Sequence, residues 1–250
     1  MFTTKNWFYL ALFFASLPVV ASILFTVSPT PDVNTDNNTK SSGGRTRVIA
    51  LCVICIFLGS AAENTMTNWI SGFMEKALQI PKAVGDIMGL AIFALLLATT
   101  RVLYAKFSPD ISKTLLVSMI GSAVCYIVAG SSSAVILSFI ACILLGIFTS
   151  MLWPGTLILM EQKTHAPGVA AYALMAASGD MGASVAPQLM GIIVDKVSAS
   201  GFAHELSAAT GMTPDEIGLR TGTVITSVFP ILGTLLLIYI IRSFSKKKLQ

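Results

Sequence analysis

The sequence predicts an all-α integral membrane protein with seven transmembrane helices. The chain of 250 residues is 54% hydrophobic and only 11% charged, whereas charged residues make up about a quarter of a soluble domain. A helix needs about 20 predominantly apolar residues to span a bilayer. Such stretches occupy residues 7–27, 48–67, 83–104, 114–130, 134–160, 168–194 and 224–241. Over half of the chain would therefore lie in hydrocarbon, which leaves little for a soluble domain.

The first predicted span, residues 7–27, holds no charged residue and is followed by the sequence Ser28-Pro-Thr-Pro31. A cleaved signal peptide is the alternative interpretation. Its apolar core would have only about 7 to 15 residues and would follow a basic segment, whereas here the apolar stretch is longer and only Lys5 precedes it. We therefore expect a retained helix in residues 1–27, followed by a polar linker in residues 28–47.

The remaining six spans are expected to form one domain, residues 48–250. After the second span, residues 69–81 are amphipathic and too polar for hydrocarbon. The fifth span contains Trp153-Pro-Gly155, which should kink or interrupt the helix because proline lacks an N–H group. In the loop of residues 198–220, Thr213 precedes a proline and two acidic residues, which predicts the start of a short helix.

The basic residues predict the orientation, because cytoplasmic loops collect Lys and Arg. With residues 28–47 inside, the cytoplasmic side holds eleven of the 16 Lys and Arg residues: Lys40, Arg45, Arg47, Arg101, Lys106, Lys113, Lys163, Arg242, Lys246, Lys247 and Lys248. We expect a plasma (inner) membrane protein with its N-terminus outside and its C-terminus in the cytoplasm. The net charge of +4 is scattered, so membrane lipid is an expected partner and nucleic acid is not.

Enzyme, metal and cofactor chemistry are not expected. All four cysteines lie in apolar runs, and Cys52 and Cys55 form a C-x-x-C pair. A redox or metal site is the alternative there, but small apolar packing residues are favoured. Intramembrane aspartyl proteases share a Gly-x-Gly-Asp motif, whereas Ala177-Ser-Gly-Asp180 lacks the first glycine and no second mid-span Asp accompanies it.

Polar residues in the second span mark the first candidate site. Glu63 is followed by Asn64, Asn68 and Trp69, and ionisable groups in a membrane are costly unless paired or hydrated. Because no Lys or Arg is predicted at comparable depth, we expect Glu63 to bind substrate or a proton. Pairing with a base or capping of a broken helix is the alternative. Trp69 would offer a stacking surface, although both it and Trp153 could be interfacial belt residues.

The sixth span carries the second candidate site. Asp180, Ser184 and Gln188 repeat at four-residue intervals, so they share one helix face. Asp180 and Gln188 are expected to form a polar cluster in which Asp180 couples to protons, with a buried structural hydrogen bond as the equal alternative. Gly182 and Ala186 are four residues apart on the same helix, a spacing that lets helix backbones approach closely.

Three motifs in order resemble the C-terminal half of a major facilitator superfamily transporter of the fucose-permease-like kind. They are Gly59-Ser-Ala-Ala-Glu-Asn-Thr-Met-Thr-Asn-Trp69, Trp153-Pro-Gly-Thr156 and Ser178-Gly-Asp-Met-Gly-Ala-Ser-Val-Ala-Pro-Gln-Leu-Met-Gly-Ile-Ile-Val-Asp195. The resemblance covers residues 48–245. It implies that the six later spans correspond to family helices seven to twelve, that residues 7–27 correspond to helix six, and that helices one to five are absent. The family's basic motif is echoed by Arg101-Val-Leu-Tyr-Ala-Lys106, without its acidic residue before the arginine or its glycine after the tyrosine.

The resemblance implies part of a secondary active transporter that moves a small polar solute, such as a sugar, by proton symport. Its substrate-binding residues would be Glu63, Asn64, Asn68, Trp69, Trp153, Asp180 and Gln188, with Glu63 and Asp180 as proton-coupling groups. The missing helices would come from another chain, or a homo-oligomer would replace them. The alternative is a non-transporting truncated or interaction protein of the membrane, in which the polar groups only hold helices together.

Overall fold

The computed structural model describes residues 4–28, 43–164 and 167–244, and all regular structure in these ranges is helical. The chain divides into two compact units, Met1–Thr39 and Lys40–Gln250. The first unit contains α1 (Thr4–Val27), whose apolar segment is Ala11–Leu24. Most of the predicted linker, residues 29–42, lies outside the described residues. Its predicted end at residue 47 is wrong, because the next helix already begins at Gly43.

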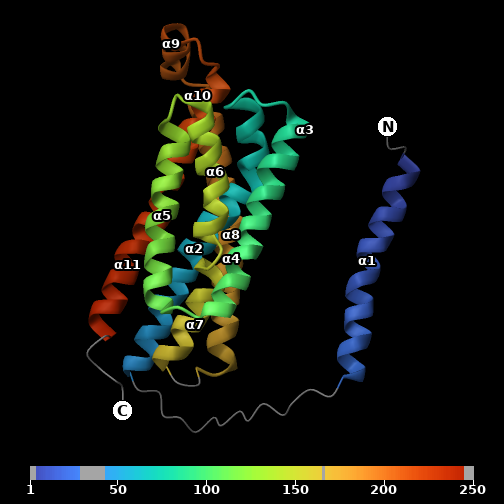
Figure 1. Ribbon diagram of the computed structural model, residues 1–250, viewed down its shortest axis with the longest axis vertical. Helices are drawn as coiled ribbons and strands as arrows, with labels where there is room; N and C mark the ends of the chain where they lie inside the picture. Colours follow the sequence, from blue (N-terminus) through green and yellow to red (C-terminus); the bar gives the residue numbers. More distant parts are fainter. Residues whose placement is uncertain (1–3, 29–42, 165–166, 245–250) are drawn as a thin grey trace. The chain divides into compact units, whose positions relative to one another are not determined.

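The second unit is a bundle of helices that run largely side by side (Figure 1). In chain order they are α2 (Gly43–Lys76), α3 (Lys82–Val84), η1 (Gly85–Ala91, a π-helical segment), α4 (Ile92–Phe107), α5 (Ile111–Ser131), α6 (Val135–Thr149), α7 (Leu152–Thr164), α8 (Val169–Ser198), α9 (Gly201–Thr210), α10 (Pro214–Thr226) and α11 (Val228–Phe244). Helices α3, η1 and α4 follow one another without a break and form one helical run, as do α10 and α11 on either side of Ser227.

Helix α2 is the centre of the bundle and packs against α8, α7 and α11. Its closest approach is to α8, where a methyl group on Gly182 would overlap the backbone carbonyl of Phe57. On its other side, the hydroxyl of buried Tyr126 in α5 donates a hydrogen bond to the carbonyl of Ala62, with an O–O distance of 2.6 Å. The close packing at Gly182 and the hydrogen bond from Tyr126 therefore hold α2, the helix that carries Glu63, in position.

Five helical runs among the described residues are long and apolar enough to cross a membrane. They are Gly44–Lys76, Lys82–Phe107, Ile111–Ser131, Val135–Thr164 and Pro214–Phe244. These runs coincide with the second, third, fourth, fifth and seventh predicted spans. Helix α8 has 30 residues but is not among the five, because polar and charged side chains recur along it. By the length and hydropathy of its helices, the chain is a multi-pass integral membrane protein.

Local details both confirm and correct the sequence analysis. Thr213 caps α10 as predicted, since its side chain accepts a hydrogen bond from the Glu216 backbone N–H. Residues 69–76 do not form a separate amphipathic segment but continue α2 to Lys76. Helix α9 was not predicted. Arg220, expected at the end of a loop, lies buried in α10, where it donates to the carbonyls of Ser132 and Ala77 and pairs with Glu216.

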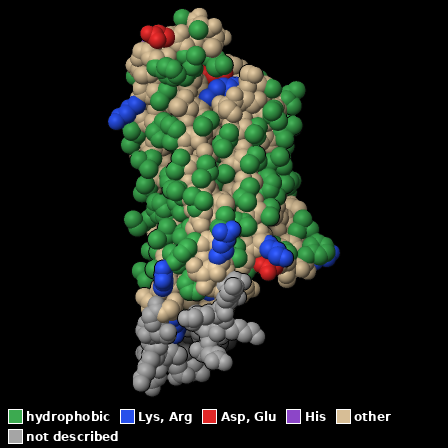
Figure 2. Space-filling model, turned by 90° about the vertical axis from the view of Figure 1, so that its left-hand side faces the viewer, with side chains coloured by type: hydrophobic (Ala, Val, Ile, Leu, Met, Phe, Trp, Pro, Cys, Tyr) green, Lys and Arg blue, Asp and Glu red, His purple; other side chains and the backbone are tan. Residues whose placement is uncertain are grey.

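The surface of the second unit matches a membrane environment. Large apolar side chains such as Val117 and Leu235 are each 60% exposed. Figure 2 shows hydrophobic side chains covering the middle of one face, with Lys and Arg side chains gathered toward its two ends. An apolar band between charged ends is the arrangement that a bilayer requires of a protein surface.

Candidate functional site

Glu63 is paired with a base, contrary to the interpretation that no Lys or Arg lies at its depth. The Arg101 Nη2 atom lies 3.0 Å from Glu63 Oε1. The Glu63 side chain is only 14% exposed, whereas that of Arg101 is 42% exposed. Arg101, which the charge count grouped with the cytoplasmic residues, lies inside α4, which continues to Phe107. The alternative reading of Glu63, that it pairs with a basic residue, is therefore the one that the structure shows.

The same arginine also holds the broken fifth span. The helix is interrupted between α6 and α7 at Ser150 and Met151, which confirms the break predicted from Pro154 and Gly155. Because Pro154 has no N–H group, the carbonyl of Ser150 lacks its usual helical donor four residues ahead. The Arg101 Nε atom donates to that carbonyl over 2.9 Å. One guanidinium thus joins α2, α4 and the break between α6 and α7.

The second carboxylate oxygen of Glu63 is left without a partner. Glu63 Oε2 is buried and makes no hydrogen bond with any described residue. A buried acceptor without a donor is costly, and more so for a charged group. Protonation of this oxygen, or a donor on a bound solute, would relieve that cost. Glu63 therefore has one oxygen fixed by Arg101 and a second that is available for chemistry.

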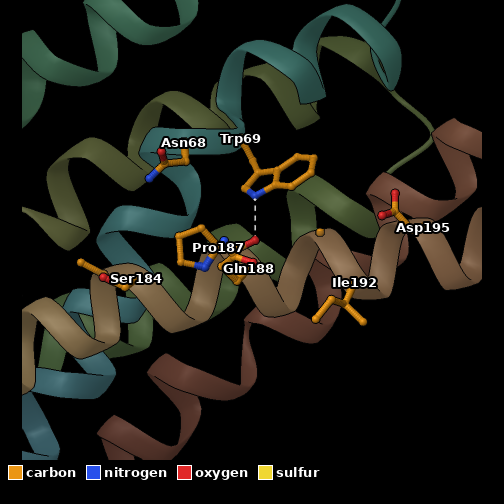
Figure 3. Close-up of a pocket in the computed structure, with 9 residues that line it drawn as sticks. Asn68, Trp69, Ser184, Pro187, Gln188, Ile192 and Asp195 are labelled. Carbon is orange, nitrogen blue, oxygen red and sulfur yellow. Dashed lines mark hydrogen bonds between the residues drawn. The ribbon is translucent and has the colours of Figure 1, made fainter.

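A cleft lies between α2 and α8, on the side that carries the predicted amides and tryptophan. It has a volume of about 570 Å³, and the residues that line it include Asn68, Trp69, Ser184, Pro187, Gln188 and Asp195. Figure 3 shows the Trp69 ring lying across α8 with its N–H group aimed at the Pro187 carbonyl. That hydrogen bond measures 3.1 Å. Since the indole N–H is used on the protein, Trp69 offers its ring surface to the cleft.

The two asparagines of α2 are partly occupied by their own helix. The Asn64 amide donates to the carbonyl of Ser60 over 3.0 Å, and the Asn68 amide donates to the carbonyl of Asn64 over 2.8 Å. The Asn64 amide also donates to the Ser60 hydroxyl over 3.3 Å, so only its oxygen is left for other partners, whereas Asn68 keeps its oxygen and a second N–H group. Asn68 is exposed and lines the cleft, whereas Asn64 is half-buried and does not.

The structure does not bring Asp180 and Gln188 into one cluster. Both are exposed on the polar face of α8, with Ser184 between them. Gln188 lines the cleft and Asp180 does not. Within the described part of the chain, the Asp180 carboxylate makes neither a hydrogen bond nor an ion pair, so the structure shows no buried structural role for it.

Trp153 also lies apart from the cleft. It is half-buried and packs with the small hydrophobic cluster that contains Cys52 and Ile56. A methyl group on Gly179 would overlap the indole nitrogen of Trp153, so the ring lies directly against α8 one residue before Asp180. Trp153 therefore packs between helices and does not line the cleft.

Sequence reasoning missed Arg101, Ser150 and Asp195 as members of these sites. One signal for Arg101 was present, because the third predicted span of residues 83–104 already contained it. An arginine inside an apolar stretch is a functional or paired group by default. Within the described ranges, the structure groups no three His, Cys, Asp or Glu side chains that could hold a metal ion. The chain matches no family model, no curated protein and no solved structure.

Proposed function

We propose that residues 43–244 form one half of the transport pathway of a secondary active transporter. In this proposal the helical runs containing α2, α4, α5, α6 with α7, α8, and α10 with α11 are six crossings that correspond to the C-terminal half of a major facilitator superfamily carrier. Helix α1 would be a seventh crossing that precedes them. The N-terminus would lie outside and the C-terminus in the cytoplasm, and a small polar solute such as a sugar would move in symport with protons.

The observation that carries the proposal is the uneven distribution of polar groups. Exposed Thr67, Asn68, Arg101, Asp180 and Ser184 lie on α2, α4 and α8. Between Val117 and Ile127 in α5, and between Val228 and Leu235 in α11, every exposed residue is apolar. A polar side chain in a membrane costs free energy where it contacts lipid, and much less where it contacts water or a second protein surface. The polar sides of α2, α4 and α8 therefore suit a solute pathway, and the other faces suit lipid.

The contacts of Arg101 suggest how proton binding and helix movement are coupled. A proton on Glu63 would remove the negative charge that holds the guanidinium, and the ion pair would weaken. Arg101 would then be free to leave the Ser150 carbonyl as well. Broken helices beside a substrate site are typical of transporters, whose alternating access moves one bundle against another. In this mechanism Glu63 carries the proton and the break between α6 and α7 is the moving part.

The cleft between α2 and α8 would hold the solute. Asn68 and Gln188 can each donate and accept hydrogen bonds. Ser184, whose hydroxyl donates to the Asp180 carbonyl, can accept one, and the Trp69 ring offers an apolar surface beside them. Sites with one aromatic surface and a few convergent polar groups are typical of small-molecule recognition. The other wall of the pathway would come from a chain that carries the remaining helices or from a second copy of this chain.

A second candidate function is favoured by the Glu63–Arg101 ion pair itself. In a non-transporting membrane protein, this pair and the Trp69–Pro187 hydrogen bond would only hold helices together. The two candidates differ in what they require of the exposed groups. A purely structural role gives no reason for Asp180, Ser184 and Gln188 to be exposed on one face of α8.

Uptake into vesicles tests the proposal. Membrane vesicles that contain the chain, with and without a co-expressed N-terminal half of a major facilitator superfamily carrier, are given labelled sugars, amino acids and organic acids under an imposed pH gradient. We expect saturable uptake of a neutral polar solute only when a second half is present. Glu63→Gln should abolish proton-driven accumulation, whereas Glu205→Gln, an exposed acid on α9, should not. Absence of uptake for every solute, with the protein inserted and folded, would favour the structural candidate.

A further inference from the structure

A second cavity lies on the lipid-facing side of the bundle, away from the polar cleft. It is formed by the last turns of α4, the first turns of α5 and the end of α6, and its volume is about 430 Å³. Its walls are mainly apolar and include Leu103, Phe107, Val117, Phe148 and Met151. We call it the α4–α5 crevice. It shares no lining residue with the cleft between α2 and α8.

The mouth of the α4–α5 crevice differs from its walls, because it carries a positive charge. Lys113, in the first turn of α5, is part of the lining and is exposed. The nearest acid in sequence, Asp110, uses its carboxylate to accept a hydrogen bond of 3.1 Å from the Lys113 backbone N–H group. The Lys113 ammonium has no ion-pair partner among the residues that the structure describes. The crevice thus combines an apolar interior with an uncompensated cation at its edge.

The exposed side chains around the crevice indicate which molecule would contact its opening. Val102, Phe107 and Val117 flank it with exposed fractions of 68%, 70% and 60%. In a membrane these side chains contact lipid, so an acyl chain is the molecule adjacent to the opening. Lys106 lies in the last turn of α4. The distribution of Lys and Arg along the sequence predicts that this end of the bundle lies at the cytoplasmic surface.

We propose that the α4–α5 crevice binds one acyl chain of an anionic phospholipid from the cytoplasmic leaflet, with the lipid phosphate on Lys113. Basic pockets between membrane helices on this side recognise anionic headgroups, and the leaflet itself is rich in them. The inference rests on the proposed orientation of the chain in the membrane but does not depend on whether it transports a solute.

The position of the crevice gives the lipid a structural consequence. Phe148 and Met151 lie on either side of Ser150, whose carbonyl accepts the hydrogen bond from Arg101. An acyl chain packed against these two residues would support the break between α6 and α7. An anionic lipid would therefore stabilise the arrangement in which Arg101 holds the break.

Thermal unfolding of the full chain in a neutral detergent tests this proposal. The buried thiols of Cys52, Cys55, Cys125 and Cys142 would report unfolding through a maleimide dye. Dioleoyl-phosphatidylglycerol should raise the unfolding temperature at lower concentration than dioleoyl-phosphatidylcholine, and inorganic phosphate should have no effect. Lys113→Gln should weaken the phosphatidylglycerol response about fivefold, the factor that corresponds to one basic residue near an anionic lipid.

Two further variants separate the site from general effects. Lys82→Gln removes an exposed charge at the far end of the helical run that contains α4 and should leave the advantage of phosphatidylglycerol unchanged. Val117→Trp fills the crevice and should reduce the response to both lipids while the protein without lipid unfolds near the wild-type temperature. An equal response of the wild type to both lipids, or an undiminished phosphatidylglycerol response in Lys113→Gln, would overturn the proposal.

Discussion

Replacing Arg101 by methionine should destabilise the bundle more than the loss of any exposed lysine. The substitution keeps the apolar stem of the side chain but removes the hydrogen bond to Ser150 and the ion pair with Glu63, which span 2.9 Å and 3.0 Å. It leaves a carboxylate that is 14% exposed without its cation. It also leaves the Ser150 carbonyl without a donor, because Pro154 cannot supply one.

The expected magnitude follows from the burial of the two partners. Exposed ion pairs contribute up to about 1 kcal/mol, whereas removal of one partner from a fully buried pair costs about 3–5 kcal/mol. The Glu63–Arg101 pair lies between these limits, since Glu63 is largely buried and Arg101 is 42% exposed. We therefore expect Arg101→Met to lower the free energy of unfolding by about 2 kcal/mol. For a chain of this size that corresponds to a decrease of roughly 4–8 °C in unfolding temperature.

The assay is again maleimide labelling of the four buried cysteines during heating in detergent. Lys106→Met is the matched control, because it removes an exposed positive charge from the same helix and should change the free energy by less than about 0.5 kcal/mol. Combining Arg101→Met with Glu63→Gln should cost less than the sum of the single changes, because no charge is then stranded. If Arg101→Met unfolds at the same temperature as Lys106→Met, the reasoning about this pair is refuted.

Two other predictions concern helix packing and orientation. Gly182→Ala should destabilise the bundle by about 1–3 kcal/mol in the same assay, because the added methyl would overlap the Phe57 carbonyl. Gly72→Ala, where nothing lies within 4 Å, should be neutral or stabilising, and an equal loss in both variants would contradict the close approach of α2 and α8. Cysteines introduced at Ser108 and Ala208 should differ on intact cells, with an impermeant maleimide labelling only Ala208. Labelling of Ser108 with protection of Ala208 would reverse the proposed orientation.

The sequence was sufficient for the helical class and for five of the spans, because long apolar runs can be read without knowing their neighbours. Pro154 also located the break in the fifth span, since the missing N–H group acts locally. Helix α9 was missed because its ten residues are too few to display a clear apolar period. The early start of α2 was missed because the Gly-rich segment before it resembles a linker.

The partner of Glu63 could not be deduced from sequence positions. The depth of a residue in the membrane was counted in residues from the end of its own predicted span. This count does not give the axial offset or the tilt of one helix relative to another. Arg101 lies near the end of α4 and Glu63 lies well inside α2, yet the two side chains meet. The same limit applies to Asp180 and Gln188, which share a helix face. Only Gln188 lies where α2 and α8 enclose a cleft.

The central claim is that polar side chains of α2 and α8 line an aqueous pathway, and cysteine accessibility tests it most directly. Thr67, Ser184, Val117 and Leu235 are all exposed in the second unit, so exposure alone does not distinguish them. Each is replaced singly by cysteine, and the variants are treated in permeabilised membranes with a charged methanethiosulfonate. We expect reaction at residues 67 and 184, which would face water, and no reaction at residues 117 and 235, which would face lipid. Protection of residues 67 and 184 to the same degree as the lipid-facing pair would contradict it.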